Sequence, residues 1–202
     1  MKTQVSATKS KPVAEIRAFT TLESWEKWLN SNQEKAAQQG IWMQLAKKVS
    51  TIKTISYAQA LDVALCYGWI DGQKKAYDEN FWIQKFTPRR ARSIWSKINV
   101  GHTERLIKAG KMQPTGQKQI DLAKNDGRWG QAYDSSSTAN IPTDLQAELD
   151  KNLLAKEFFS TLNKTNTYAI IWRLQTARKP ETRLRRLKLL VGMLDRKEKI
   201  YP

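Results

Sequence analysis

The stretch from Gly68 to Asn99 reads GWIDGQKKAYDENFWIQKFTPRRARSIWSKIN and lies near the middle of the chain. Its runs Trp69–Lys75 and Phe81–Phe86 favour strands, and the residues Tyr77–Asn80 between them favour a turn. Pro88 has no amide hydrogen to offer a neighbouring strand, so it is expected to end the second strand. The stretch therefore predicts an antiparallel hairpin, around which we expect the first part of the chain to be organised.

The second half of this stretch is strongly basic, with no acidic residue between Lys85 and Lys97. Aromatic residues beside arginines suggest an apolar base with a cationic rim, which suits an anionic ligand. Arginine offers a fork of donors that matches phosphate or carboxylate, and a helix that begins near Ser93 would add free backbone N–H groups. The alternative is an amphipathic hairpin whose charges are simply solvated. The predicted anion site consists of Arg89, Arg90, Arg92, Ser93, Ser96 and Lys97, supported by Trp69, Asp71 and Trp95.

Asp71 and the arginines that follow the hairpin are expected to have different roles. If the chain stays extended after the second strand, Arg90 and Arg92 point to one side and Arg89 to the other. We expect Arg89 to face inward and to pair with Asp71, although a turn after the strand would exchange these roles. Asp71 shares a strand face with Trp69, and partial desolvation there would raise its pKa and suit acid–base catalysis. The alternative for this carboxylate is a salt bridge to Arg89 or Arg90.

Several short motifs, read in order, resemble those of one bacterial family. They are GWIDG, FTPRR and SIWSKIN in the central stretch, then GKMQPTG (Gly110–Gly116), DGRW (Asp126–Trp129) and ETRLRRL (Glu181–Leu187). The chain resembles the YdeI/OmpD-associated family, also called the OmdA or bacteriocin-protection family, from about Trp25 to its end. The resemblance implies a stress or bacteriocin-protection role, and it implies neither a reaction nor catalytic residues.

Length, composition and net charge limit the classes of protein to which the chain can belong. A chain of 202 residues, 40% of them hydrophobic, can bury a core in one large domain or in one domain with a small appendage. The net charge of +16 favours anionic partners. The single cysteine excludes an intramolecular disulfide, which fits a reducing cytoplasm. The N-terminus lacks the apolar core of a signal peptide, and no apolar run approaches the roughly 18 residues of a membrane helix. We therefore expect a cytoplasmic protein without a membrane span.

The sequence contains few histidine and cysteine residues, which many catalytic and metal sites use. His102 is the single histidine and Cys66 the single cysteine, which is too few soft ligands for a zinc site. We expect His102 to be an exposed residue at a helix start and Cys66 to be a small buried thiol. No GxGxxG or GxxxxGK[ST] loop occurs to bind phosphate, and no GxSxG elbow presents a serine. The sequence therefore predicts no cofactor and no metal, and an enzyme that uses Asp71 as acid or base ranks last.

Local signals predict further elements on both sides of the hairpin. Thr20 is expected to open a helix whose buried face carries Leu22, Trp25, Trp28 and Leu29. The other expected elements are a strand at Ile41–Lys48, a helix capped by Ser56 and Gln59 that stops at a left-handed Gly68, and helices capped at Asn99 or Thr103 and at Thr115.

Composition divides the chain into four parts. Residues 1–14 are polar, basic and aperiodic, so we expect a disordered tail. Residues 15–133 are predicted to form an α+β domain with a small antiparallel sheet and helices. Residues 134–141 are rich in serine and threonine and predict a linker. Residues 142–202 are predicted to form an all-α domain, with helices at Pro142–Leu149, Leu153–Leu162, Tyr168–Arg178 and Pro180–Lys197.

In the last of these helices, Leu184, Leu187, Val191 and Leu194 are expected to form the buried face. The surrounding region, Arg173–Lys199, is a second basic cluster, and such charges on a helix are usually solvated.

Two main hypotheses for function remain open. The first is a non-enzymatic cytoplasmic protein that binds an anionic small molecule or an acidic surface around Arg89–Lys97. The alternative is a nucleic-acid-binding protein that uses both basic clusters, Arg89–Lys97 and Arg173–Lys199.

Overall fold

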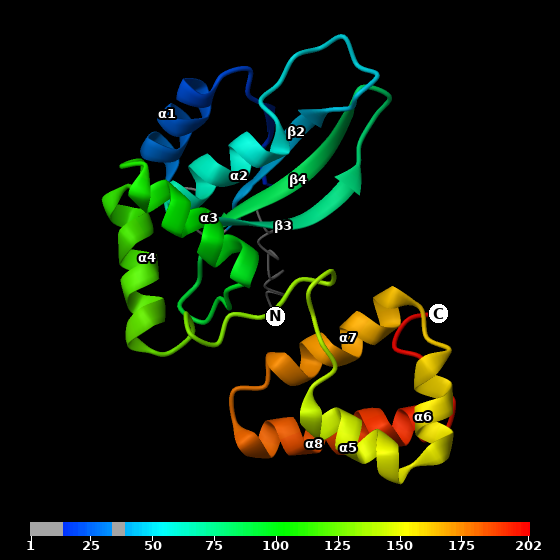
Figure 1. The fold of residues 1–202 in the computed structure, drawn as a ribbon. Helices are drawn as coiled ribbons and strands as arrows, with labels where there is room; N and C mark the ends of the chain where they lie inside the picture. Colours follow the sequence, from blue (N-terminus) through cyan, green and yellow to red (C-terminus); the bar gives the residue numbers. More distant parts are fainter. Residues whose placement is uncertain (1–13, 34–38) are drawn as a thin grey trace, which may run out of the picture. The chain divides into compact units, whose positions relative to one another are not determined.

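The computed structural model describes residues 14–33 and 39–202, which form four strands and eight helices (Figure 1). The chain divides into two units. The first unit comprises the described residues up to Ala91 together with His102–Asp121, and the second comprises Arg92–Gly101 with Leu122–Pro202. The first unit contains the sheet and the second is helical, so the predicted α+β class followed by an all-helical region is confirmed. Residues 1–13 of the predicted tail lie outside the described residues.

The first unit is built on a four-stranded sheet of strand order β1-β2-β4-β3. β2 (Ile41–Ala46) pairs antiparallel with β4 (Phe81–Pro88), and β4 pairs antiparallel with β3 (Trp69–Ala76), so the predicted hairpin is confirmed. β1 (Ile16–Ala18) adds a parallel edge to β2 and was not predicted, because three residues are too short to show an alternating pattern. The sheet is therefore mixed rather than purely antiparallel.

The β3–β4 hairpin has a tight turn at one end and an irregularity near the other. In the turn, Asp78 Oδ1 accepts hydrogen bonds from the backbone N–H groups of Asn80 and Phe81 at 2.8 and 2.7 Å, as expected of an aspartate turn. Between Asp71 and Lys74 the pairing shifts register. The buried side chain of Gln84 donates to the carbonyl oxygens freed there, at Gly72 (2.9 Å) and Gln73 (3.3 Å).

Helices α1 (Leu22–Asn32) and α2 (Tyr57–Cys66) cover one face of this sheet (Figure 1). Alternate residues of β2 are buried in the same core as the apolar faces of both helices. At its centre is an aromatic cluster whose neighbouring ring centroids lie 4.9 to 6.3 Å apart, in the range for edge and tilted contacts. We call this the tryptophan core; its members are Phe19, Trp25, Trp28, Trp69 and Phe86.

The predicted N-caps can be compared with the residues that cap each helix in the structure. Ser56 and Gln59 form the expected capping box of α2, whose following glycine, Gly68, has a φ of +77° as predicted. Thr21, rather than Thr20, caps α1, because it is the Thr21 hydroxyl that accepts the N–H of Ser24.

Two further predicted caps are wrong. α3 (Lys97–Lys108) begins earlier than expected, because Ser96 Oγ accepts the N–H of Asn99 at 3.2 Å. α4 (Pro114–Asn125) begins one residue before Thr115, at a proline that suits a first helical turn.

The second unit contains four helices in its C-terminal part: α5 (Thr143–Lys151), α6 (Leu153–Ser160), α7 (Lys164–Gln175) and α8 (Pro180–Asp195). All four were predicted, although α7 begins four residues earlier than expected because Asn163 caps it. Their core is apolar and consists of Leu145, Leu149, Ala155, Phe159, Ile170, Leu174, Leu187, Leu190 and Leu194. Leu184 was expected in this core and is instead 53% exposed, so the predicted buried face of α8 is wrong at that position.

Candidate functional site

The arginines after the hairpin differ in exposure. Arg89 is only 6% exposed, and its backbone N–H donates to the carbonyl oxygen of Gly68 at 2.9 Å. Arg90 and Arg92 are exposed. Arg89 and Arg90 belong to the first unit, whereas Arg92 belongs to the second.

Asp71 has a different partner from the one predicted. The hydroxyl of Tyr57 donates to Asp71 Oδ2 at 2.8 Å, and no ion pair to Asp71 occurs within the described residues. Burial raises the pKa of Tyr57, and the hydrogen bond to Asp71 and the charge of that carboxylate raise it further. The phenol therefore stays protonated at neutral pH and holds the carboxylate in place, so the predicted pairing of Asp71 with Arg89 is wrong.

The remaining residues of the predicted site make contacts within the second unit. The carbonyl oxygen of Ser93 accepts Arg128 Nη1 at 2.9 Å, and Ser96 caps α3. Lys97 Nζ forms an ion pair with Asp134 at 2.7 Å. Trp95 is 2% exposed and packs on Trp129, with ring centroids 4.9 Å apart. These contacts give this half of the basic segment a structural role.

Arg128 is a structurally important residue that the sequence analysis did not identify. It is 3% exposed, and its Nε donates to both carboxylate oxygens of Asp126, at 2.8 and 2.7 Å. Hydrogen bonding from Arg128 lowers the pKa of Asp126. The DGRW motif was the available signal, since it places this arginine two residues after an aspartate. The pair joins the turn after α4 to the segment at Ser93.

His102 and Cys66 differ in how well they were predicted. Cys66 is buried as expected, and burial raises its pKa to about 11, so the thiol is not a nucleophile at neutral pH. His102 lies inside α3 rather than at its start. Its Nδ1 is 3.5 Å from Asp62, which also accepts Arg105 Nη2 at 2.6 Å.

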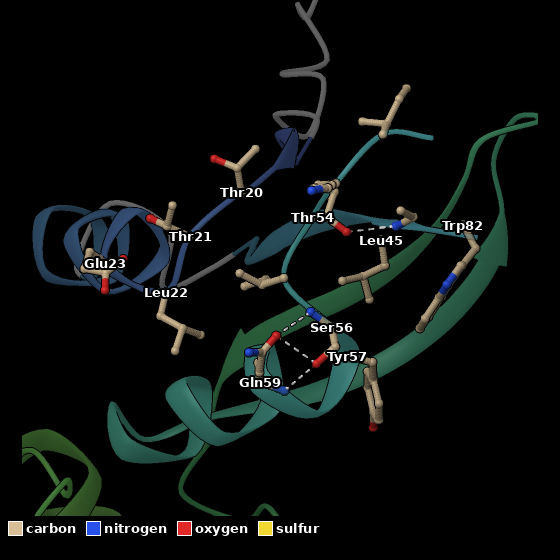
Figure 2. A pocket seen from close by; sticks show the side chains of 14 residues that line it. Thr20, Thr21, Leu22, Glu23, Leu45, Thr54, Ser56, Tyr57, Gln59 and Trp82 are labelled. Carbon is tan, nitrogen blue, oxygen red and sulfur yellow. Dashed lines mark hydrogen bonds between the residues drawn. The ribbon is translucent and has the colours of Figure 1, made fainter. Parts of the chain in front are cut away.

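One cleft of the first unit lies where α1 and α2 begin (Figure 2). It has a volume of about 660 Å³, and Leu45 and Trp82 supply part of its wall. Its polar lining is already used locally: Ser56 caps α2, and Thr54 Oγ1 accepts the backbone N–H of Ala46 at 3.0 Å. Glu23 and Lys53 bring opposite charges to the lining. The polar groups named here are therefore already hydrogen-bonded within the protein, and the lining has no excess of positive or negative charge.

A cationic cluster lies on the opposite face of the sheet. Ile41, Met43 and Leu45 point into the core, so Trp42, which alternates with them along β2, faces away from the helices. Lys75 Nζ lies 4.8 Å from the centroid of the Trp42 ring, and Lys85 Nζ lies 5.2 Å from it. We call Trp42, Lys75 and Lys85 the lysine–tryptophan cluster.

The two ammonium groups of this cluster share one indole ring and lack an anionic partner among the residues that the structure describes. Within the described residues, neither Lys75 nor Lys85 forms an ion pair with an Asp or Glu. Burial lowers the pKa of Lys85, and the positive charge of Lys75 lowers it further. This cluster was not predicted, because its three residues come together only through the pairing of β2, β4 and β3.

The neighbouring lysine extends the cationic character of the hairpin to its other face. Lys74 Nζ lies 4.3 Å from the ring centroid of Trp82, whose ring is 6.0 Å from that of Tyr57. Trp82 lines the cleft at the starts of α1 and α2. Lys74, which contacts Trp82, and Lys75, which contacts Trp42, therefore lie on opposite faces of the hairpin.

The second basic cluster, Arg173–Lys199, is only partly a solvated surface. Arg183 binds Asp144 through two hydrogen bonds of 2.7 and 2.8 Å and also donates to the carbonyl oxygen of Leu174. Arg186 Nη1 donates to the carbonyl oxygen of Arg173 at 2.6 Å. These two guanidinium groups satisfy carbonyl groups at the end of α7, which is a stabilising arrangement for a helix C-terminus.

In residues 14–33 and 39–202, every helix is too short or too polar to cross a membrane. That part of the chain also brings no three His, Cys, Asp or Glu side chains together in a way that could hold a metal ion.

Two protein families match the chain, and together the two matched segments cover most of it. Residues 17–119, just over half of the chain, match a domain of unknown function, DUF8412. Residues 138–197 match the family described as bacteriocin-protection, YdeI or OmpD-associated (OmdA). The motifs GWIDG, FTPRR and SIWSKIN, which we compared with the OmdA family, lie in the first segment. No curated protein and no solved structure matches. The chain thus belongs to the DUF8412 family and carries an OmdA domain at residues 138–197.

Proposed function

We propose that this protein binds an anionic ligand that carries phosphate, and that the lysine–tryptophan cluster is its site. The observation that carries the proposal is the pair of ammonium groups 4.8 and 5.2 Å from one indole centroid, without a carboxylate partner among the described residues.

Like charges held together are unfavourable, and burial of Lys85 adds to the cost. An anion that contacts both Lys75 and Lys85 offsets the repulsion and adds charge-assisted hydrogen bonds, which are stronger than neutral ones. The net charge of +16 attracts anions to the whole surface and speeds their encounter with the site.

The originally predicted segment contributes less to this proposal. Arg89 is buried, and Lys97 is paired with Asp134. Arg90 and Arg92 are exposed and add to the general attraction of anions. A stress or bacteriocin-protection role rests on the resemblance to the OmdA family alone, and a cytoplasmic location rests on the single cysteine.

Nucleic acid is the second candidate ligand, and one observation favours it. The Trp42 ring lies near two lysine ammonium groups on a sheet face, and single-stranded nucleic acids bind where bases stack on aromatic rings beside cationic groups. A phosphodiester chain and a small phosphate compound differ in salt dependence, since each phosphate contact of a polymer releases counterions.

Single substitutions test the site. We expect Lys75→Ala and Lys85→Ala each to weaken the binding of pyrophosphate about tenfold, because each removes a charge-assisted contact. Isothermal titration calorimetry at low salt measures the effect. Both substitutions are expected to change the free energy of unfolding by less than about 0.5 kcal/mol, because the lost lysine–indole contact is offset by relief of repulsion.

The matched control is Lys118→Ala, which removes an exposed lysine of α4 and should leave the affinity unchanged. Equal weakening by all three substitutions would show a diffuse charge effect, and no weakening by Lys75→Ala and Lys85→Ala would exclude the cluster as the site. A parallel titration with an oligothymidylate at two salt concentrations separates the two ligand classes.

A further inference from the structure

The second unit contains a surface groove between α7 and α8 that the proposed function does not use. It has a volume of about 430 Å³, and the chain end at Ile200 contributes to its lining. The polar lining comes from Arg173 and Arg186, and the apolar lining comes from Trp172, Leu189, Leu190, Met193 and Ile200.

The apolar side of the groove continues onto the surface. Leu189 is 60% exposed, whereas the next residue, Leu190, is 3% exposed and belongs to the core. Leu189 and Met193 are four residues apart on α8 and therefore lie along one face of the helix. An exposed leucine alone is ordinary, but here it borders a groove lined by other apolar side chains.

The two arginines of the groove are held in position by hydrogen bonds to neutral groups. Arg173 Nη1 donates to the carbonyl oxygen of Ala169 at 3.0 Å, and its guanidinium lies 5.8 Å from the centroid of Tyr201. Arg186 Nη1 donates to the carbonyl oxygen of Arg173 and to Thr176 Oγ1.

Neither arginine forms an ion pair with an acidic residue in the part of the chain that the structure describes. Each guanidinium has five N–H donors, so both retain donors for a carboxylate. The exposed residues Arg185 and Lys188 on α8 add positive charge nearby.

We propose that this groove docks an acidic amphipathic peptide segment of a partner protein. The apolar side chains of the segment fill the groove along Leu189 and Met193, and its Asp or Glu side chains pair with Arg173 and Arg186. Helical segments dock into grooves in this way through apolar residues spaced three or four apart, and charge complementarity selects acidic ones. The groove is open at the surface, which suits a peptide better than an enclosed small molecule.

A selection of peptides from a random displayed library, with the full chain as bait, tests the proposal. We expect enriched peptides to combine Asp or Glu with apolar residues at helical spacing. The most enriched peptide, synthesised with a fluorescent label, is then the probe for anisotropy measurements. Leu189→Glu should weaken its binding at least about tenfold, because it places a negative charge at the edge of the apolar lining.

Leu184→Glu is the matched control. Leu184 lies on the same helix, is 53% exposed and does not line the groove, so its replacement should change the affinity less than about twofold. Circular dichroism checks that both variants keep the fold. The proposal is wrong if no acidic amphipathic peptides are enriched, or if both substitutions weaken binding equally. It is also wrong if a small amphiphile such as decanoate binds with the same sensitivity to Leu189→Glu while no peptide is enriched.

Discussion

Replacing Trp25 with alanine is expected to lower the free energy of unfolding by about 4 kcal/mol, the range found for large aromatic residues in cores. Trp25 is 0% exposed, and its ring centroid lies 4.9 Å from that of Phe19 and 5.4 Å from that of Trp28. Its Nε1–H also donates to the carbonyl oxygen of Ala60 at 3.1 Å, which ties α1 to α2. The loss is a large part of the roughly 5–15 kcal/mol by which a typical domain is stable.

Urea denaturation followed by circular dichroism measures this effect. Trp42→Ala is the control, because Trp42 is a tryptophan of the same unit on the opposite face of the sheet and is only partly buried. We expect Trp42→Ala to cost about 1 kcal/mol, as for most single substitutions. Equal losses for the two variants would mean that the tryptophan core is not the centre of the first unit.

Gly116→Ala is expected to destabilise the protein by about 3 kcal/mol, although alanine normally favours a helix over glycine by roughly 0.5–1 kcal/mol. Gly116 lies in α4, and a Cβ there would overlap with the carbonyl oxygen of Cys66 at the end of α2. It would also come within 2.6 Å of Met112 Sδ. The methionine side chain can move, but the carbonyl oxygen belongs to a helix backbone, so the helices would have to separate.

Gly101→Ala provides the matched comparison, because Gly101 lies inside α3 and an added Cβ would meet nothing within 4 Å. We expect this substitution to stabilise the protein by roughly 0.5–1 kcal/mol. Melting curves of the two variants therefore should shift in opposite directions. A shift in the same direction for both would contradict the close contact between α2 and α4.

Several features that depend on neighbours in the sequence were predicted well, although the predicted caps of α1, α3 and α4 were wrong. The capping box of Ser56 and Gln59 is complete within four residues, and the left-handed Gly68 follows directly from the end of that helix. The β3–β4 hairpin was predicted because its turn and both strands lie in one short stretch. Arg89 is buried, as hypothesised, although the chain does not stay extended after β4 and turns at residues 91–92.

Features that depend on distant parts of the chain were missed. Lys97 was expected to bind an anion because the sequence gives no sign that Asp134 reaches it. Asp71 was assigned to an arginine, whereas Tyr57 comes from a helix that the sequence does not place. The lysine–tryptophan cluster requires the register of three strands, which no local pattern contains. The predicted domain boundaries, with a linker at residues 134–141, stay a prediction.

The pKa of Lys85 is a measurable quantity that should change when the proposed ligand binds. Its pKa lies below the ordinary lysine value of 10.5, because burial and the charge of Lys75 disfavour the ammonium form. At pH values between the lowered pKa of the folded protein and the ordinary lysine pKa, the unfolded chain binds more protons than the folded one. The free energy of unfolding of the ligand-free protein therefore rises as the pH rises through the folded pKa. A bound anion favours the ammonium form and therefore moves the pKa back up.

The most direct test is an NMR titration of the Lys85 side chain against pH, in the free protein and in the presence of excess pyrophosphate, with Lys118 as internal reference. The proposal predicts that the pKa of Lys85 lies below 10.5 in the free protein and rises with pyrophosphate, while the side-chain resonances of Lys118 do not respond to pyrophosphate. A pKa of Lys85 that is identical with and without pyrophosphate, at concentrations at which Lys75 and Trp42 also show no spectral change, would contradict anion binding at this cluster.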